Sequence, residues 1–444
     1  MGPLVVVGGN AAGMSAAAAA RRTDPALPIT VLEAGPDASY ASCGIPYVIS
    51  GEVAALGALV TAPPDEFRRT RDIDVRTGAE VTRIDPAGRR VALANGDEIA
   101  YGALVVATGA RPVRPPVPGA DLPGVHVLRD LRSAREMQAA LAPHVRPRVV
   151  LVGSGPIGLE AAEALLARGA LVTVVEIAGQ VLPALSPVVA APVAAALAQA
   201  GVRVHTGATV SEIVPDGDGL AVVADGAPLP ADLVVLGTGV APETRLAVAA
   251  GCALGDRDAI AVDRRGRTSV PGVWAAGDCA VAHHQVLDRP MWMPLATVAN
   301  AQGRVAGRDA AGGEARYGGA IGSWVSRFRD VSFGSAGLDE AAASDAGFTP
   351  RAIAREGRDR SGYMPGALRV LVRLVWDAPS GRLLGAQMAG EAAVAPRLHT
   401  AAAAIGAGMT IRALAESDFA YAPPVAALRD PLELAAAAAI GDAR

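Results

Sequence analysis

Short apolar runs followed by glycine-rich turns recur along the chain and predict buried strands. Residues 4–7 form the first run, and the sequence Gly-Gly-Asn-Ala-Ala-Gly at 8–13 follows directly. The alanine-rich segment 14–22 predicts a helix, and a second apolar run at 29–33 predicts the next strand. A strand, a tight turn, a helix and a second strand in this order are typical of a βαβ unit.

The same architecture begins again beyond residue 148. An apolar run at 149–152 enters Gly-Ser-Gly-Pro-Ile-Gly at 153–158, a helix is expected to about residue 168, and a strand is expected at 171–176. Because two βαβ units of one design stand in one chain, the sequence indicates two nucleotide-binding domains.

Further apolar runs that end in glycine are expected to complete these two domains. They occupy residues 104–109 and 233–239, and the proline-rich segment 112–118 is expected to be a linker. From about residue 321 the pattern changes to several strands followed by helices, which indicates a separate C-terminal domain. The strands of this part are predicted at 323–328, 368–376 and 383–388.

The second glycine turn has the complete pattern of a dinucleotide-binding loop. Gly153, Gly155 and Gly158 allow a tight turn and a close approach of a pyrophosphate to a helix N-terminus. Glu176 ends the next strand, where a carboxylate accepts hydrogen bonds from a ribose 2′-hydroxyl. No arginine follows it through Gln180 to receive a 2′-phosphate, so NADH is favoured over NADPH.

The first glycine turn departs from this pattern at one position. Gly8, Gly13 and Glu33 keep their places, but the middle glycine is replaced by Asn10, a residue that tolerates a positive φ. Two nucleotide sites in one chain imply FAD together with a pyridine nucleotide. Asp278, after Ala-Gly, is expected either to bind a flavin ribitol hydroxyl or to cap a helix.

Composition restricts the classes of function. The chain has 444 residues, is 51% hydrophobic and carries a formal net charge of −4, which gives no basic surface for nucleic acid. Arginine supplies every basic charge because the sequence contains no lysine, which excludes Schiff-base lysine chemistry and a Walker-type phosphate loop. Three cysteines without CxxC spacing argue against a zinc site. We expect no metal, no membrane span and a cytoplasmic location.

One thiol stands where it would lie beside a bound redox cofactor. Cys43 follows Glu33 closely, and neither Pro46 nor Val48, the positions of a partner in CxxC or CxxxxC spacing, is a cysteine. The segment after the thiol predicts a helix whose first turn contains Pro46. We expect that helix N-terminus to lower the pKa of Cys43. The alternative is a buried structural thiol, which is the role expected for Cys252 and Cys279.

With these pieces together, the chain resembles the FAD-dependent pyridine nucleotide–disulfide oxidoreductases over essentially its whole length. The resemblance is to their single-cysteine branch, which contains coenzyme A-disulfide reductase, NADH oxidase and NADH peroxidase. It rests on Ser-Tyr-Ala-Ser-Cys-Gly-Ile-Pro-Tyr at 39–47, Ala-Thr-Gly at 107–109, Ala-Gly-Asp at 276–278 and Tyr-Ala-Pro-Pro at 421–424.

This resemblance implies an α/β fold with two Rossmann-like nucleotide-binding domains and a C-terminal α+β dimerisation domain. The expected limits are 1–118 with 246–320 for a discontinuous FAD domain, 119–245 for the NAD(P)H domain and 321–444 for the dimerisation domain. It also implies a homodimer with a shared active site, and the following cofactor contacts. The FAD contacts are Gly8, Asn10, Ala11, Ala12, Gly13, Glu33, Ser42, Thr108, Gly109, Gly277, Asp278, Pro294, Ala296 and Tyr421; the NAD contacts are Gly153, Gly155, Ile157, Gly158, Glu176 and Gly239.

Single residues separate members of the branch. The oxidases and peroxidases typically have a histidine in the first glycine loop, where this chain has Ala11, so a disulfide is favoured as substrate. Tyr363 and Tyr421 match tyrosines that coenzyme A-disulfide reductases take from the partner subunit, where they act with Cys43. The coenzyme A groove implied by the resemblance contains Ser15, Arg22, Ser39, Ser42, Arg71, Asn300 and Arg429.

The sequence therefore predicts that NADH reduces FAD and that reduced flavin reduces an oxidised Cys43. The substrate is expected to be coenzyme A disulfide or a related small disulfide or persulfide. One alternative is an NADH oxidase or peroxidase in which Cys43 cycles through a sulfenic acid. Oxygen reactivity stays open because Pro156 replaces an aromatic residue that shields the nicotinamide pocket in many members. The other alternative is a flavoprotein electron carrier in which Cys43 takes no part.

Overall fold

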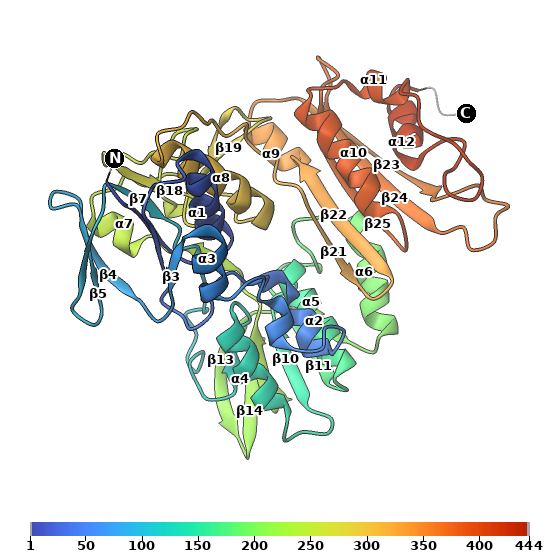
Figure 1. Cartoon of the computed structure of the whole chain (residues 1–444). Helices are drawn as coiled ribbons and strands as arrows, with labels where there is room; N and C mark the ends of the chain where they lie inside the picture. Colours follow the sequence, from blue (N-terminus) through green and yellow to red (C-terminus); the bar gives the residue numbers. More distant parts are fainter. Residues whose placement is uncertain (1, 442–444) are drawn as a thin grey trace.

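The computed structural model describes residues 2–441 and consists of three parts around separate sheets (Figure 1). The ends of the expected domain limits, residue 1 and residues 442–444, lie outside the described residues. The first sheet is parallel and has five strands in the order β18-β7-β1-β2-β3. Its central strands, β1 (Leu4–Val7) and β7 (Ala103–Val106), are buried along their whole length, as expected of apolar runs with both faces covered.

Segments far apart in the sequence meet in this first sheet. Strand β18 (Val273–Ala275) pairs in parallel with β7 and so returns the chain to the sheet that it left after residue 106. Helix α1 (Ala11–Thr23) packs along helix α8 (Ala296–Ala310) over one face. Helix α1 begins three residues before the predicted start at 14, because the glycine turn passes into the helix directly after Asn10.

The second sheet has the order β12-β11-β10-β16-β9 and repeats the design of the first. Strand β10 (Arg148–Val152) leads into helix α5 (Pro156–Ala167), and β11 (Leu171–Glu176) follows beside it. Strand β16 (Leu233–Leu236) pairs with β10 on the other side. The predicted pair of Rossmann-like units is confirmed in the fold.

The C-terminal part is an antiparallel sheet with the order β21-β22-β25-β24-β23, partly covered by α10 (Val394–Gly406) and α12 (Pro431–Ala439). Three of its strands were predicted nearly in place: β21 (Trp324–Phe328), β24 (Arg369–Asp377) and β25 (Leu383–Gly390). Within residues 2–441, no helix combines the length and the apolar character that crossing a bilayer requires.

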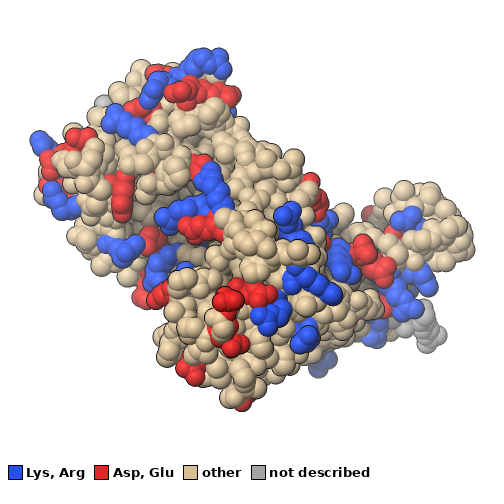
Figure 2. Space-filling model, turned by 90° about the horizontal axis from the view of Figure 1, so that it is seen from below, with Lys and Arg blue, Asp and Glu red and all other residues tan. Residues whose placement is uncertain are grey.

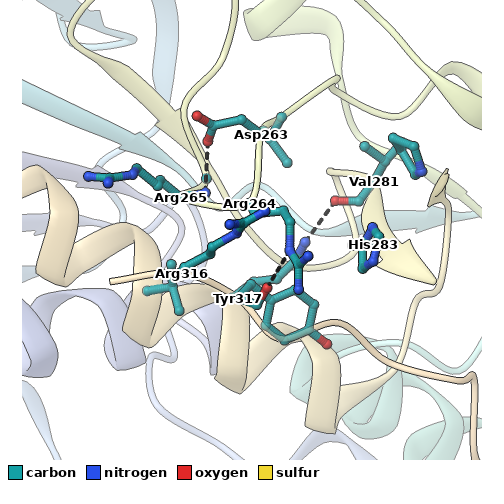
Figure 3. A pocket seen from close by; sticks show the side chains of 12 residues that line it. Asp263, Arg264, Arg265, Val281, His283, Arg316 and Tyr317 are labelled. Carbon is teal, nitrogen blue, oxygen red and sulfur yellow. Dashed lines mark hydrogen bonds between the residues drawn. The ribbon is translucent and has the colours of Figure 1, made fainter. Parts of the chain in front are cut away.

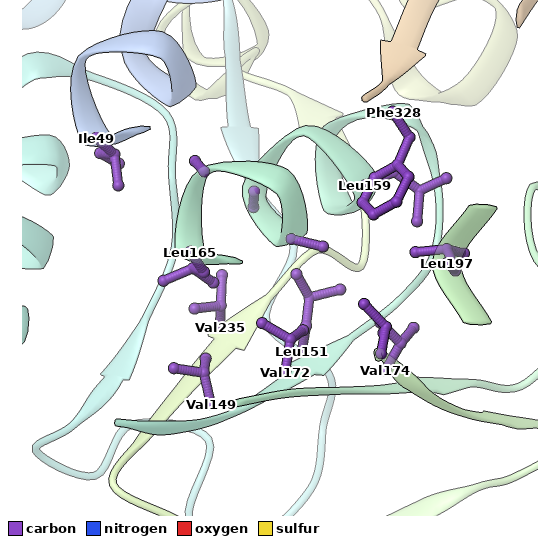
Figure 4. Packing of buried hydrophobic residues seen from close by; sticks show 14 of the residues in the cluster. Ile49, Val149, Leu151, Leu159, Leu165, Val172, Val174, Leu197, Val235 and Phe328 are labelled. Carbon is purple, nitrogen blue, oxygen red and sulfur yellow. The ribbon is translucent and has the colours of Figure 1, made fainter. Parts of the chain in front are cut away.

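One apolar core joins all three parts and holds the helix that follows Cys43. Helix α2 (Ile45–Ser50) contributes Ile49 and packs on α5, which contributes Leu159. Phe328, from the end of β21, lies next to Leu159 and is fully buried (Figure 4). Because α2 is anchored from two sides, the position of the thiol depends on packing between parts of the chain that are far apart in sequence.

Candidate active site

The two glycine loops are built alike, and the structure shows what each glycine does. A Cβ on Gly8, at φ +106°, would lie 2.1 Å from the Ala107 carbonyl oxygen, and a Cβ on Gly13 would lie 1.8 Å from that of Gly8. These two positions therefore need glycine for turn geometry and close packing. In the second loop a Cβ on Gly155 would meet nothing within 4 Å, so the space beside this position is open.

The expectation that Asn10 uses its tolerance of positive φ is wrong. Asn10 has φ −116°, in the extended region, where it forms the N-cap position of α1. Gly155, its counterpart in the second loop, also has a negative φ of −66°. The middle position of this turn therefore does not require a residue with a positive φ, and asparagine adopts its conformation without strain.

The two carboxylates at the strand ends brace their own loops. Glu33 accepts from the backbone N–H groups of Gly9 (2.7 Å) and Gly35 (2.8 Å). Glu176, which is buried, accepts in the same way from Ser154 (2.8 Å) and Ala178 (2.9 Å), and also from the Ser154 hydroxyl. Each carboxylate thus fixes the loop that precedes its strand, and Glu33 also lines the cavity described next.

A cavity of about 540 Å³ lies above the carboxyl ends of the first sheet. The backbone of the first glycine loop forms one wall, and Thr108 and Gly109 form another. Arg129 reaches across from the second part of the chain and pairs with Asp278 at 3.1 Å. This cavity fits a flavin dinucleotide, because a crowded glycine loop, the strand-end carboxylate of Glu33 and Arg129 line it, whereas Asp278, the partner of Arg129, does not line it. Among its lining residues are Gly8, Gly9, Asn10, Glu33, Tyr40, Ser42, Thr108, Gly109 and Arg129.

Cys43 lies in a short 3-10 turn, Ser42–Gly44, immediately before helix α2. The residue is exposed, but neighbouring protein atoms crowd its thiol. This desolvation, followed by the negative charge of Glu160, raises the pKa of Cys43, while Arg129 and a hydrogen bond with Ser42 lower it less. The expected lowering by the helix N-terminus is therefore wrong for this chain without bound ligands. Helix α2 has only six residues, and the loss of water around the thiol is the largest cause of the raised pKa.

A second cavity, of about 550 Å³, contains Cys43, and we call it the substrate groove. It lies between helices α1 and α8, the segment 39–43 that ends at Cys43, and residues of the segment 61–71, and it shares Asn10, Tyr40 and Ser42 with the flavin-sized cavity. The thiol therefore stands where two cavities meet. The groove brings together six of the seven predicted substrate residues: Ser15, Arg22, Ser39, Ser42, Arg71 and Asn300. It also contains four of the predicted flavin contacts: Asn10, Ala11, Ser42 and Ala296.

The far end of the substrate groove is rich in arginine. The groove continues into a neighbouring cavity of about 510 Å³ that shares Arg22 and Arg71 and adds Arg21 and Arg69. Arg304 also lines the groove, although the sequence reasoning missed it. Its spacing of four residues from Asn300 on α8 was the signal, since such residues share one face of a helix.

This local concentration of arginine is not part of a generally basic surface. On the face seen from below, acidic and basic side chains are interspersed (Figure 2). The chain as a whole has a formal net charge of −4. The arginines of the substrate groove are therefore a local concentration of positive charge and not part of a basic surface that covers the molecule.

Other predicted residues lie apart from the thiol. Tyr363 and Tyr421 are exposed at 74% and 46%, and Arg429 donates to Glu433 at 2.9 Å in the C-terminal part. None of the three lines the substrate groove, and their role across a subunit interface stays a prediction. Among the other predicted flavin contacts, Ala12 and Gly277 pack together and Pro294 precedes α8. Among the predicted NAD contacts, Ile157 is exposed on α5 and Gly239 follows β16 with φ +93°.

The electrostatics around Cys43 predict a pH dependence. Alkylation of the thiol by iodoacetamide is expected to rise with a midpoint above the value of about 8.5 that is usual for cysteine. Glu160→Gln removes a negative charge that disfavours the thiolate, so the midpoint is expected to fall. Arg129→Gln removes a positive charge and is expected to raise it. Identical midpoints in the three proteins, read by mass spectrometry, would contradict this account of the site.

Comparisons with known proteins agree with this geometry. Residues 2–303 match the family model described as "Pyridine nucleotide-disulphide oxidoreductase", and residues 325–431 match its dimerisation domain. An NAD(P)H coenzyme A polysulfide/persulfide reductase of Pyrococcus horikoshii is 36% identical, with 97% of this chain and 96% of the relative covered. An NADH oxidase of Methanocaldococcus jannaschii is 34% identical, with 97% of each covered. A solved NAD-dependent persulfide reductase of A. fulgidus superposes with a TM-score of 0.96 at 38% identity, covering 99% of this chain and 83% of the other.

Proposed function

The chain belongs to the pyridine nucleotide–disulphide oxidoreductase family, and we propose that it uses NADH to reduce coenzyme A disulfide, or a persulfide of coenzyme A, at Cys43. In the disulfide reaction, NADH, a proton and one disulfide give NAD⁺ and two thiols. The family uses flavin and NAD(P)H; FAD as the flavin and NADH as the preferred reductant are part of the proposal. The position of Cys43 at the junction of two cavities is the observation that carries it.

The residues on one side of Cys43 suit binding of the cofactors, and those on the other side suit binding of the substrate. FAD, when bound in the flavin-sized cavity, supplies the path for two electrons from NADH to an oxidised Cys43. Glu33 and the first glycine loop hold the dinucleotide, and Arg129 and Asp278 hold each other beside it. Gly155 leaves room for the NADH pyrophosphate at the start of α5.

The substrate groove suits a thiol that carries several phosphates. Coenzyme A has a pyrophosphate and a 3′-phosphate at one end and its sulfur at the other. Arg22, Arg71 and Arg304 stand along the same groove as Cys43 and supply forked donors for phosphate. The Cys43 thiolate would attack one sulfur of the disulfide, form a mixed disulfide and release one coenzyme A thiolate.

The second subunit supplies the remaining part of the proposal. The chain carries the dimerisation domain of its family at 325–431, and this part contains the exposed Tyr363 and Tyr421. In a homodimer, the tyrosine hydroxyls of the partner would protonate the leaving thiolate above Cys43. Their high exposure in a single chain supports this assignment, because large exposed aromatic side chains are typical of interfaces.

Reduction of oxygen is the second candidate, favoured by the relative from M. jannaschii that carries the name NADH oxidase. The two candidates separate when NADH consumption is measured with coenzyme A disulfide under argon and with oxygen alone. We expect disulfide-driven turnover to exceed oxygen-driven turnover by about 10-fold or more. The reverse ratio, together with a sulfenic acid on Cys43 in the intact mass, would reject the disulfide as substrate.

A further inference from the structure

A third cavity, of about 420 Å³, lies apart from the flavin-sized cavity and the substrate groove, and we call it the Arg264 cavity. It shares no lining residue with the substrate groove, although both use helix α8. Asn300 and Arg304 face the groove, whereas Gln302 and Val305 face the Arg264 cavity from another side of the same helix. The cavity is therefore separate from the site of the proposed reaction.

Positively charged donors gather at this cavity. The Arg264 guanidinium donates through Nε and Nη2 to the carbonyl oxygens of Tyr317 and Gly318, each at 2.9 Å. These two bonds fix a planar group that has further N–H donors to offer. Figure 3 shows Arg264, Arg316 and Tyr317 close together on one side of the cavity, with His283 and Val281 opposite.

The acidic residues near the cavity already have partners. Asp309 is buried and pairs with Arg265 and Arg267, and Asp263 accepts from the backbone N–H of Arg265. Asp288 lies 3.3 Å from His283. Within residues 2–441, no carboxylate forms an ion pair with Arg264 or Arg316. Two guanidinium groups at one cavity thus form no ion pair with the part of the chain that the structure describes. The Asp263 carboxylate also lines the cavity but accepts from the backbone N–H groups of Arg265 and Arg267.

The rest of the lining is apolar. Val262, Val281, Pro290 and Val305 contribute aliphatic surface, and the ring of Tyr317 lies beside the arginines. A bare inorganic ion would leave this surface uncovered, and the volume lies in the range of small-molecule sites. We propose that the Arg264 cavity binds a phosphate monoester that carries a flat or apolar group, the class to which nucleoside monophosphates belong.

A ligand bound in the Arg264 cavity would affect the flavin site through the side chain of Gln302. Gln302 lines the cavity, and its Oε1 accepts from the Gly277 N–H at 3.1 Å while its Nε2 donates to the Val281 carbonyl at 2.7 Å. Gly277 precedes Asp278, the partner of Arg129. A ligand that touches Gln302 therefore acts on the turn that contains Asp278, and through its ion pair on Arg129, which lines the flavin-sized cavity.

AMP is a suitable ligand for the test. The FAD-loaded full-length protein is titrated with AMP by calorimetry in the presence of saturating NAD⁺ and coenzyme A, which occupy the other nucleotide sites. We expect one AMP per chain, weaker binding of inorganic phosphate, and none of adenosine. Arg316→Ala removes an exposed charge at the cavity and is expected to weaken AMP binding by about 10-fold or more.

The matched control is Arg308→Ala, which removes an exposed arginine of α8 that does not line the cavity, and it is expected to leave the affinity unchanged. Absence of AMP binding, equal affinities in Arg316→Ala and the parent, or tight binding of adenosine would each overturn the proposal. Binding of AMP is also expected to shift the visible absorption bands of the flavin. An unchanged spectrum at saturation would refute the connection through Gln302.

Discussion

Cys43→Ser is expected to lower NADH-dependent reduction of coenzyme A disulfide by about 1,000-fold or more. The serine hydroxyl cannot form a mixed disulfide, and no other cysteine is placed to replace Cys43. Cys252 and Cys279 are buried at 6% and 0% exposure, and neither lines the substrate groove. The measurement is the rate of NADH oxidation at 340 nm under argon with coenzyme A disulfide as the only acceptor.

The controls separate loss of the thiol from loss of the fold. The Cys43→Ser protein is expected to retain its flavin and to pass electrons from NADH to ferricyanide at the parental rate. Cys252→Ser changes a thiol that packs against Thr268 and is expected to keep disulfide turnover. Full disulfide turnover in Cys43→Ser would remove the thiol from the mechanism and support the electron-carrier alternative.

The double substitution Arg22→Ala with Arg71→Ala is expected to raise KM for coenzyme A disulfide by about 100-fold or more, with a smaller change in kcat. Both guanidinium groups line the groove that contains Cys43, and that groove includes no residue of the glycine loop 153–158 that is proposed to bind NADH. A hydrogen bond to a charged group contributes about 1.5–3 kcal/mol, and about 1.4 kcal/mol corresponds to a factor of ten in affinity. Steady-state kinetics with varied disulfide at saturating NADH measure the effect.

A substrate without phosphates provides the sharpest control for this prediction. Pantethine has the same disulfide and the same pantetheine arms but lacks the nucleotide, so its KM is expected to be equal in the double variant and the parent. Arg308→Ala again serves as the matched loss of one exposed arginine on a nearby helix. A KM for coenzyme A disulfide that stays at the parental value would show that the groove does not bind the phosphates.

Much of the fold was predictable because its signals are local. Each glycine loop lies within a few residues of its strand and its helix, so apolar runs and glycine spacing predicted the central strands of both parallel sheets, but not the edge strands at residues 74–76, 125–126 and 203–206. Helix α1 was placed three residues late, since alanine at 11 and 12 carries no distinctive start signal. Strand β22 (Val331–Gly337) was missed because glycine and serine at its centre hide the alternation, although Gly334 packs against the Trp324 carbonyl of β21.

The candidate site was only partly predictable. Cys43, Arg22, Arg71 and Asn300 were predicted as site residues from the sequence, and all four line one cavity in the structure. The pKa of the thiol was predicted in the wrong direction, because desolvation depends on atoms that packing brings near. The nearby charge of Glu160 comes from helix α5, far along the chain, and no spacing rule relates it to Cys43.

The two nucleotide loops, the strand-end carboxylates and the single thiol without a neighbouring partner could be read from the sequence, because each depends on residues close together in the chain. Three features became visible only in the folded chain: the thiol between two cavities, Arg304 in the substrate groove, and a third cavity bordered by two arginines without carboxylate partners among residues 2–441. Cavities and unpaired charges arise where elements distant in sequence pack together, so local patterns do not reveal them. Helix α8 illustrates this, since its sequence is continuous but its two faces serve different sites.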